Sequence, residues 1–422
     1  MNDHEEFRIS EGRPSPTAAA RGDAHPPVPR IRFKEFGGAW ESRPLGKSFD
    51  ERNERSGIGR LLSVTIGEGV IPASENGKRD NSSTDKSNYK CVKTGDLAYN
   101  SMRMWQGACG ASAFDGIVSP AYTVLIPKEG TDSPFAERLF KRTKILKIFQ
   151  AYSQGLTSDT WNLKYPALSE IELAFPSLPE QQRIAELFRN LDETIAATDA
   201  RLEKLRQSKK SLLEKMFPRP GASVPEIRFK GFEGEWETRK LNEIADPVSE
   251  KNVRLETREA FTNSAELGII SQRDFFDFDV AKRLAGYLLI RPDDFVYNPR
   301  ISILAPFGPI NRNELGRLGA MSPLYFAFRN HGIVIDYLQV YFKTSCWHPF
   351  MRFNGDSGAR SDRFSIRNDL FMQMPILVPK NKDEQQRIGS FFRELDKLIE
   401  SVQKKAAKLR QVKSALLEEM FV

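Results

Sequence analysis

A long charged helical pattern occurs twice in this sequence, and no other feature restricts the possible folds as much. In residues 177–217 apolar side chains recur about every 3.5 residues, the spacing of a coiled-coil seam, and no Gly or Pro follows Pro179. Ser177 is a suitable N-cap, and Glu180 completes a capping box. Roughly 38 residues at about 1.5 Å per residue predict a rod of about 55 Å.

The second copy of the pattern occupies residues 381–421, displaced by 204 positions. The letters EQQRI at 180–184 return at 384–388, and Lys209 and Lys413 interrupt the two seams at the same place. A lysine at a seam position sets the register of a coiled coil at some cost in stability. A helix that is apolar on one side only needs a partner, so we expect the two copies to pack on each other.

A second repeat opens each half of the chain. IRFKEFGGAW at 31–40 returns as IRFKGFEGEW at 227–236, displaced by 196 positions. The chain therefore reads as a tandem duplication in which each copy is a whole domain followed by a rod. Aromatic and β-branched runs alternate with helical spacing inside each domain, which predicts mixed α/β folds. The predicted organisation is a disordered tail at 1–28, a first globular domain at 29–176, a central helix at 177–217, a linker at 218–224, a second globular domain at 225–379 and a C-terminal helix at 380–422.

Composition allows a nucleic-acid partner without demanding one. The 422 residues carry a net charge of +7, which is mildly basic. Three cysteines without paired spacing indicate reduced thiols and a cytoplasmic location, and four scattered histidines argue against a zinc site. No apolar run is long enough for a membrane span, and the N-terminus does not read as a signal peptide.

No catalytic motif is evident. There is no GxxxxGK[ST] loop and no glycine fingerprint for a methyl donor or dinucleotide. Asn298-Pro299-Arg300 is an incomplete methyltransferase-like motif, and Pro292-Asp293-Asp294 reads as a turn before a strand. The rods are alike while the domains differ, which favours an adaptor whose domains each read something different. Two alternatives stay open: an enzyme whose methylation or cleavage centre is not visible, and a purely structural coiled-coil protein.

The repeated segments resemble the conserved regions of the specificity subunits of type I restriction-modification systems. The resemblance rests on LPEQQRIAELFRNLDETI and DEQQRIGSFFRELDKLI, and on the two opening segments. YNSMRMWQGACG with GIVSPAYTVL, and FVYNPRISI with SPLYFAF, resemble the target-recognition domains of that family. It implies two α+β target-recognition domains, each followed by a long helix, with the two helices forming an antiparallel coiled coil.

The same resemblance implies the function and the partners. The subunit would be non-catalytic, would read one half of a split double-stranded DNA target with each domain, and would join two adenine-N6 methyltransferase subunits and two restriction subunits. No cofactor is expected in this chain; S-adenosylmethionine, ATP and Mg would serve the partner subunits. The long N-terminal tail has no explanation in the family pattern.

Candidate site residues follow from the motif blocks. DNA contact needs cations for the phosphates and side chains that reach base edges. The candidates for DNA contact are Arg103, Trp105, Gln106 and Lys164 in the first domain and Arg300, Arg312, Arg360 and Arg363 in the second. Polar residues off the seam that both rods share are the candidates for binding the methyltransferase: Gln181, Gln182, Arg183, Gln385, Gln386 and Arg387.

Overall fold

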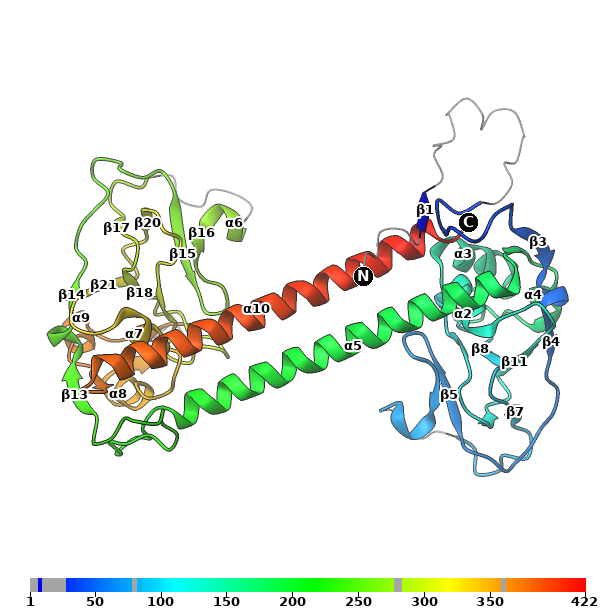
Figure 1. The fold of residues 1–422 in the computed structure, drawn as a ribbon, viewed down its shortest axis with the longest axis horizontal. Helices are drawn as coiled ribbons and strands as arrows, with labels where there is room; N and C mark the ends of the chain where they lie inside the picture. Colours follow the sequence, from blue (N-terminus) through cyan, green and yellow to red (C-terminus); the bar gives the residue numbers. More distant parts are fainter. Residues whose placement is uncertain (1–6, 10–27, 78–81, 277–282, 358–361) are drawn as a thin grey trace. The chain divides into compact units, whose positions relative to one another are not determined.

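A computed structural model describes residues 7–9, 28–77, 82–276, 283–357 and 362–422 of the chain (Figure 1). The chain divides into two compact units. Unit 1 consists of Met1–Thr198 and Lys405–Val422, and unit 2 consists of Asp199–Lys404. No helix in the described residues is long and apolar enough to cross a membrane.

Unit 1 is built around a four-stranded antiparallel sheet of order β4-β11-β8-β9, accompanied by the two-stranded sheets β5-β6, β7-β10 and β3-β12. Its strands are β2 (Ile31–Phe33), β3 (Glu41–Pro44), β4 (Phe49–Glu51), β5 (Leu62–Thr65), β6 (Gly69–Pro72), β7 (Lys90–Val92), β8 (Leu97–Asn100), β9 (Cys109–Ala111), β10 (Gly116–Val118), β11 (Tyr122–Pro127) and β12 (Glu172–Phe175). Its short helices are α1 (Leu45–Ser48), η1 (Ala73–Glu75), η2 (Met104–Gln106), α2 (Ser133–Phe140), α3 (Thr143–Tyr152) and α4 (Tyr165–Ser169).

Unit 2 has a four-stranded sheet of the corresponding order, β14-β21-β18-β19, and a second sheet of order β16-β15-β20-β17. Its strands are β13 (Glu237–Lys240), β14 (Ala245–Pro247), β15 (Ala260–Ser264), β16 (Gly268–Ser271), β17 (Leu288–Ile290), β18 (Phe295–Tyr297), β19 (Ile310–Arg312), β20 (Gly319–Met321), β21 (Phe326–Asn330), β22 (Asp356–Ser357), β23 (Phe364–Ser365) and β24 (Pro375–Val378). Its short helices are η3 (Leu241–Glu243), α6 (Gln272–Phe276), α7 (Ile335–Tyr341), α8 (His348–Asn354) and α9 (Asn368–Phe371).

Two helices of 38 residues each, α5 (Leu178–Lys215) and α10 (Lys382–Glu419), occupy the positions of the predicted rods (Figure 1). The lysines that interrupt the two seams are paired with carboxylates of the other helix. In unit 1, Lys413 lies 2.5 Å from Asp192, and in unit 2, Lys209 binds Asp396. Each pair is therefore the counterpart of the other, since both members are displaced by 204 positions.

The C-terminal end of each long helix reaches a hydrophobic core of the other repeat. In unit 1 the Phe421 ring stacks on Phe135 at 5.4 Å and packs edge-on against Trp40 at 6.1 Å. In unit 2 the Phe217 ring lies 5.8 Å from Trp236 and 5.6 Å from Tyr337. All of these side chains are buried, so the Met-Phe ends of the rods are core residues.

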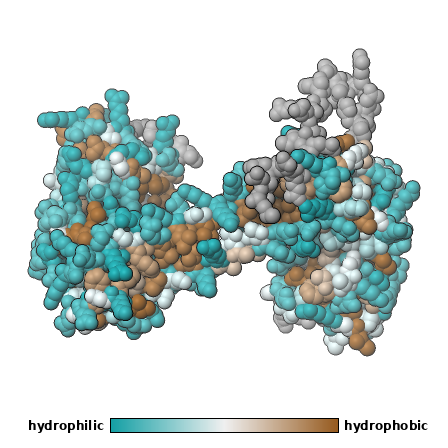
Figure 2. Space-filling model, viewed as in Figure 1, coloured by the Kyte–Doolittle hydropathy of each residue, from teal (hydrophilic) through white to brown (hydrophobic). Residues whose placement is uncertain are grey.

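The expectation that residues 1–28 lack structure is wrong for one short segment. Strand β1 (Phe7–Ile9) pairs antiparallel with β2, and the Phe7 ring lies 4.8 Å from the Phe33 ring. The Phe7 side chain thus packs on an aromatic ring of the opening segment. The rest of the predicted tail, apart from Val28, lies outside the described residues. The face of the molecule shown in Figure 2 is mostly hydrophilic, with apolar areas between the polar ones.

Candidate nucleic-acid interface

Two loops of unit 1 that are distant in the sequence lie side by side. One loop follows β8 at residues 101–108, and the other spans residues 153–163. The backbone N–H of Leu163 donates to the carbonyl of Ser101 at 2.9 Å, and the rings of Trp105 and Trp161 meet edge-on at 5.1 Å. Leu156 is fully exposed in the second loop.

Unit 2 brings the corresponding loops together in the same way. The backbone N–H of Phe364 donates to the carbonyl of Pro299 at 2.8 Å, and that of Ile301 donates to Asp362 at 3.0 Å. The exposed tip of the loop after β18 carries Ile303 and Leu304. The same framework therefore presents two adjacent loops in each unit, and the side chains on these loops differ between the units.

The loops of unit 1 contain three of the four residues that are predicted to contact DNA in the first domain, and the fourth, Lys164, directly follows the second loop. Arg103 is exposed, and together with Gln106 it lines a hollow of about 1080 Å³ whose wall is formed mainly by β5 and η1. Trp105 is half-buried and donates its indole N–H to the carbonyl of Met102 at 3.2 Å. Lys164 is exposed before α4 but does not line this hollow.

In unit 2 the four arginines that are predicted to contact DNA differ in their surroundings. Arg300 is 71% exposed, 3.8 Å from Asp362, and forms a β-bridge with the half-buried Arg363. These two arginines stay candidates for DNA contact. Arg360 lies outside the described residues.

Arg312, which is also predicted to contact DNA, is paired with two carboxylates of its own domain. Its guanidinium lies 2.5 Å from Asp293 and 2.7 Å from Asp336 and is largely buried. Burial lowers the pKa of Arg312, but the hydrogen bonds to the two carboxylates outweigh this effect and the pKa is raised. The charge is thus neutralised inside the domain, where a phosphate would have to displace both aspartates.

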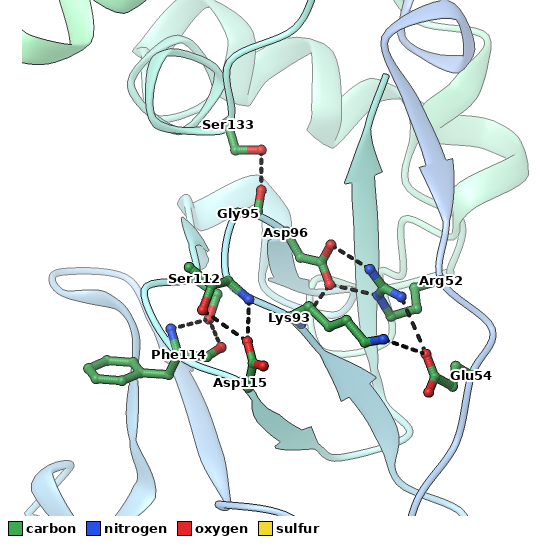
Figure 3. Close-up of polar contacts among 10 residues, drawn as sticks. Arg52, Glu54, Lys93, Gly95, Asp96, Ser112, Phe114, Asp115 and Ser133 are labelled. Carbon is green, nitrogen blue, oxygen red and sulfur yellow. Dashed lines mark hydrogen bonds and ion pairs between the residues drawn. The ribbon is translucent and has the colours of Figure 1, made fainter. Parts of the chain in front are cut away.

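A buried aspartate holds the turn that leads into β8 (Figure 3). The Asp96 carboxylate accepts two hydrogen bonds from Arg52, at 2.7 and 2.9 Å, and one from the backbone N–H of Lys93 at 2.7 Å. Ser133 at the start of α2 donates to the carbonyl of Gly95 at 2.7 Å and so ties the helix to this turn. This network positions β8 and the loop that follows it.

The equivalent turn of unit 2 confirms that Pro292-Asp293-Asp294 is a turn before a strand. Asp294 is fully buried and accepts hydrogen bonds from the backbone N–H of Arg291 at 2.8 Å and from Arg329 at 2.7 and 2.9 Å. Asp293 has a φ of 72°, and its counterpart Gly95 has a φ of 92°. Both oxygens of the Asp294 carboxylate therefore accept hydrogen bonds that hold the turn.

The residues shared by the two rod starts bind mainly within their own units, which corrects the prediction of a capping box. Glu180 does not serve as a capping-box residue: it is 1% exposed and forms two hydrogen bonds with the buried Arg32, at 2.7 and 2.6 Å. Glu384 binds Arg228 in the same way at 2.7 Å. The sequence held a signal for this ion pair. Both opening segments keep the arginine, and both rod starts keep the glutamate.

Gln181 and Gln385, which are predicted to bind a partner subunit, are buried and hydrogen-bonded within their own units. The Gln181 amide donates to the carbonyls of Gly130 and Pro176 and accepts from the backbone N–H of Asp132. Gln385 likewise donates to Pro379 and accepts from Val334. These contacts fix the loop that enters each domain helix to the start of the rod.

The remaining shared residues lie nearer the surface. Gln182, Gln386 and Arg387 are exposed, and Arg183 is half-buried. The guanidinium of Arg183 lies over the Phe33 ring at 5.1 Å, and that of Arg387 lies over Phe229 at 5.1 Å. Both arginines therefore cover an aromatic residue of the opening segment on one side.

The described residues contain no group of three His, Cys, Asp or Glu side chains placed to hold a metal ion. All three cysteines are free. Burial raises the pKa of the Cys109 thiol to about 12, which keeps it protonated and unreactive near neutral pH.

A family model described as the type I restriction modification DNA specificity domain matches residues 67–207. Residues 67–207 therefore resemble a type I DNA specificity domain. The matched segment includes both loops of unit 1, the turn held by Asp96 and most of α5. No curated protein matches the sequence.

Two solved structures are similar to this chain. The type I restriction-modification system S subunit from M. genitalium matches with a TM-score of 0.53 and 16% identity, over 94% of this chain and 99% of that chain. The HsdS subunit from Thermoanaerobacter tengcongensis matches with a TM-score of 0.47 and 17% identity, over 90% of this chain and 96% of that chain. The first of these matches shows that the chain shares its mixed α/β fold with an S subunit.

Proposed function

We propose that this chain is the DNA-specificity subunit of a type I restriction-modification complex and that each unit reads one half of a split target. The observation that carries the proposal is the pair of adjacent loops that recurs in both units with different side chains. Loops on a rigid framework are where binding residues concentrate, and a constant framework with variable loops suits the reading of two different sequences. The chain would act on DNA in the cytoplasm.

Within each unit the loops offer the groups that sequence reading requires. Arginine pairs with guanine in the major groove, and glutamine with adenine. Arg103 and Gln106 supply these groups in unit 1, and Arg300 and Arg363 supply cations in unit 2. The exposed Lys164 of unit 1 stays a candidate for a phosphate contact.

We further propose that α5 and α10 form an antiparallel coiled coil that sets the length of the unread spacer. The two counterpart ion pairs support this, because the early part of α5 meets the late part of α10 in unit 1 and the reverse holds in unit 2. Half-sites read from one face of a duplex lie about 34–36 Å apart or at multiples of that distance. Helices of this length can hold two readers at such a separation.

The chain is proposed to be non-catalytic and to join two methyltransferase and two restriction subunits, which would bring S-adenosylmethionine, ATP and Mg. The docking residues proposed for the methyltransferase are Gln182 and Arg183 on α5 and Gln386 and Arg387 on α10. Their recurrence at equivalent positions suits two copies of one partner, since a pseudo-two-fold chain matches a two-fold pair.

A domain exchange tests the reading function. Residues 29–176 are replaced by the first domain of another specificity subunit, and modified bases are mapped by sequencing DNA from cells that carry the complete system. We expect one half of the methylated motif to change while the other half and the spacer stay the same. A motif altered in both halves would refute independent reading. Methylation or cleavage by the purified chain without partners would instead favour an enzyme.

Native mass spectrometry tests the docking face. Gln182→Ala is made alone and then together with Gln386→Ala, both at exposed positions where folding should be little affected. We expect the single variant to bind one methyltransferase subunit weakly and the double variant to bind both weakly. Two partners bound to the double variant as tightly as to the wild type would exclude this face.

A further inference from the structure

A basic hollow lies in unit 2 where the end of α5 meets the end of α7. Its volume is about 560 Å³. Its charged lining residues are Lys210, Glu214, Lys215, Arg219 and Lys343. The Lys343 ammonium lies among these groups and is hydrogen-bonded to the side-chain oxygen of Asn311.

Unit 1 has the counterpart of this hollow, with a volume of about 620 Å³. It lies where the end of α10 meets α2 and α3, and Lys141, Leu417 and Glu418 correspond to Lys343, Leu213 and Glu214 of the other hollow. Its charged lining residues are Arg138, Lys141, Arg142, Lys144, Lys413 and Glu418. The two domains differ in most of their side chains, yet both keep a basic hollow at this place.

Neighbouring carboxylates neutralise only part of the charge. In unit 2, Lys215 and Arg219 share Glu226 at 3.1 and 2.8 Å, which leaves Lys210 and Lys343 against Glu214. In unit 1, Arg138 and Lys413 share Asp192, at 2.6 and 2.5 Å, and Lys141 binds Glu137 at 2.8 Å. In both hollows the cationic side chains that line the wall outnumber the carboxylates that line it or pair with them.

Each hollow adjoins a loop that we propose to read DNA, namely the loop after β8 in unit 1 and the loop after β18 in unit 2; we call these the reading loops. In unit 2, Leu304 of the exposed tip of the loop after β18 and the adjacent Ala305 form part of the wall. In unit 1 the loop after β8 contains Gly107, where a Cβ would lie 3.7 Å from the side chain of Lys141. The positive charge therefore lies beside the loops proposed to reach base edges.

We propose that both hollows bind backbone phosphates of the DNA duplex that the adjacent loops read. This inference rests on the proposed function. A phosphate next to the read bases is an anion that comes close to the reading loop by necessity, which favours DNA over an acidic protein surface as the occupant. Contacts of this kind fix the register of a protein on the duplex and carry no sequence information.

Salt dependence of DNA binding tests the inference. Lys144→Ala in unit 1 and Lys210→Ala in unit 2 remove exposed cations, and the matched controls are Lys147→Ala on α3 and Lys204→Ala on α5, which do not line the hollows. The full chain is titrated against a fluorescent 30-base-pair duplex of arbitrary sequence over a range of salt concentrations. Removing one cation that neutralises a phosphate lowers the slope of log K against log salt by about 0.9, so we expect a decrease of roughly 1.8 in the double variant and none in the double control.

The outcomes separate this inference from the proposed function. A double variant whose salt slope and affinity equal those of the control overturns the inference and leaves DNA reading intact. A variant that binds DNA normally but loses its methyltransferase in native mass spectrometry also overturns it, because the hollows would then hold an acidic protein. A wild-type chain that binds no duplex at any salt concentration contradicts the proposed function itself.

Discussion

At the scale of single residues, buried polar contacts explain why the two rod starts are alike. Arg32 and Glu180 form a doubly hydrogen-bonded ion pair, and the exposed fractions of the two residues are 6% and 1%. Arg32 also donates to the carbonyl of Gly38 at 2.5 Å, so one guanidinium joins the opening segment to α5. An alanine at either position would leave the other charge buried and unpaired.

The first prediction concerns this pair. Arg32→Ala should lower the free energy of unfolding by about 3–5 kcal/mol, the usual cost of leaving a buried charge without its partner. Urea denaturation at neutral pH measures the change. The control is Lys93→Ala, whose side chain is exposed and lies 3.7 Å from Glu54; it should cost no more than about 1 kcal/mol. Equal effects for the two variants would mean that the Arg32 pair is not buried as described.

The second prediction concerns the pH dependence that Cys109 adds. Its pKa rises on folding because burial disfavours the thiolate, so the folded chain holds this proton more tightly than the unfolded chain. Its contribution to stability is complete below about pH 9 and is lost as the pH rises toward about 12. Cys109→Ala should flatten the decline in stability over this window. In addition, the folded wild type should leave this thiol unlabelled by a thiol reagent at pH 8, checked by peptide mass mapping.

At the scale of elements, the ends of the long helices belong to the domain cores. Phe421 is buried among Trp40, Phe135 and Phe188, with ring centroids 5.4–6.1 Å away. Phe217 repeats this arrangement with Trp236, Tyr337 and Phe392. The end of each helix therefore completes a core, while its seam is the surface that we propose to pack on the other helix.

The third prediction follows from this packing. Phe421→Ala should lower the free energy of unfolding by about 3–5 kcal/mol, because it removes a large buried ring and leaves a cavity. The matched control is Val412→Ala on the same helix, at a position 40% exposed, which should cost little. Thermal denaturation of both variants gives the comparison. A Phe421 variant as stable as the control would show that the end of α10 does not complete the core.

At the scale of the whole molecule, the proposed antiparallel coiled coil makes the spacer length a property of the helices. Deleting residues 199–205 from α5 and 402–408 from α10 removes one heptad from each and keeps the seam in phase. About 1.5 Å per residue gives a shortening of roughly 10.5 Å. At about 3.4 Å per base pair, this corresponds to a spacer about three base pairs shorter.

The fourth prediction is that this double deletion shortens the methylated motif in its spacer and leaves both half-sequences unchanged. Sequencing of modified bases in cells that carry the variant system measures the motif. Deletion of the heptad from α5 alone is the control, and it should abolish assembly because the two seams no longer match. An unchanged spacer in the double deletion would mean that the helices do not set the distance.

Local pattern was enough to predict the two long helices, whose seam spacing and lack of breakers admit few alternatives, the repeat of opening segment and rod, and the turn before β18. Which polar side chains face solvent became evident in the folded structure alone. Gln181, Gln385 and Arg312 look like surface residues in a linear pattern, because Gln and Arg are usually exposed. Their partners are backbone carbonyls and carboxylates from distant segments, and such partners are identified only when the chain has folded.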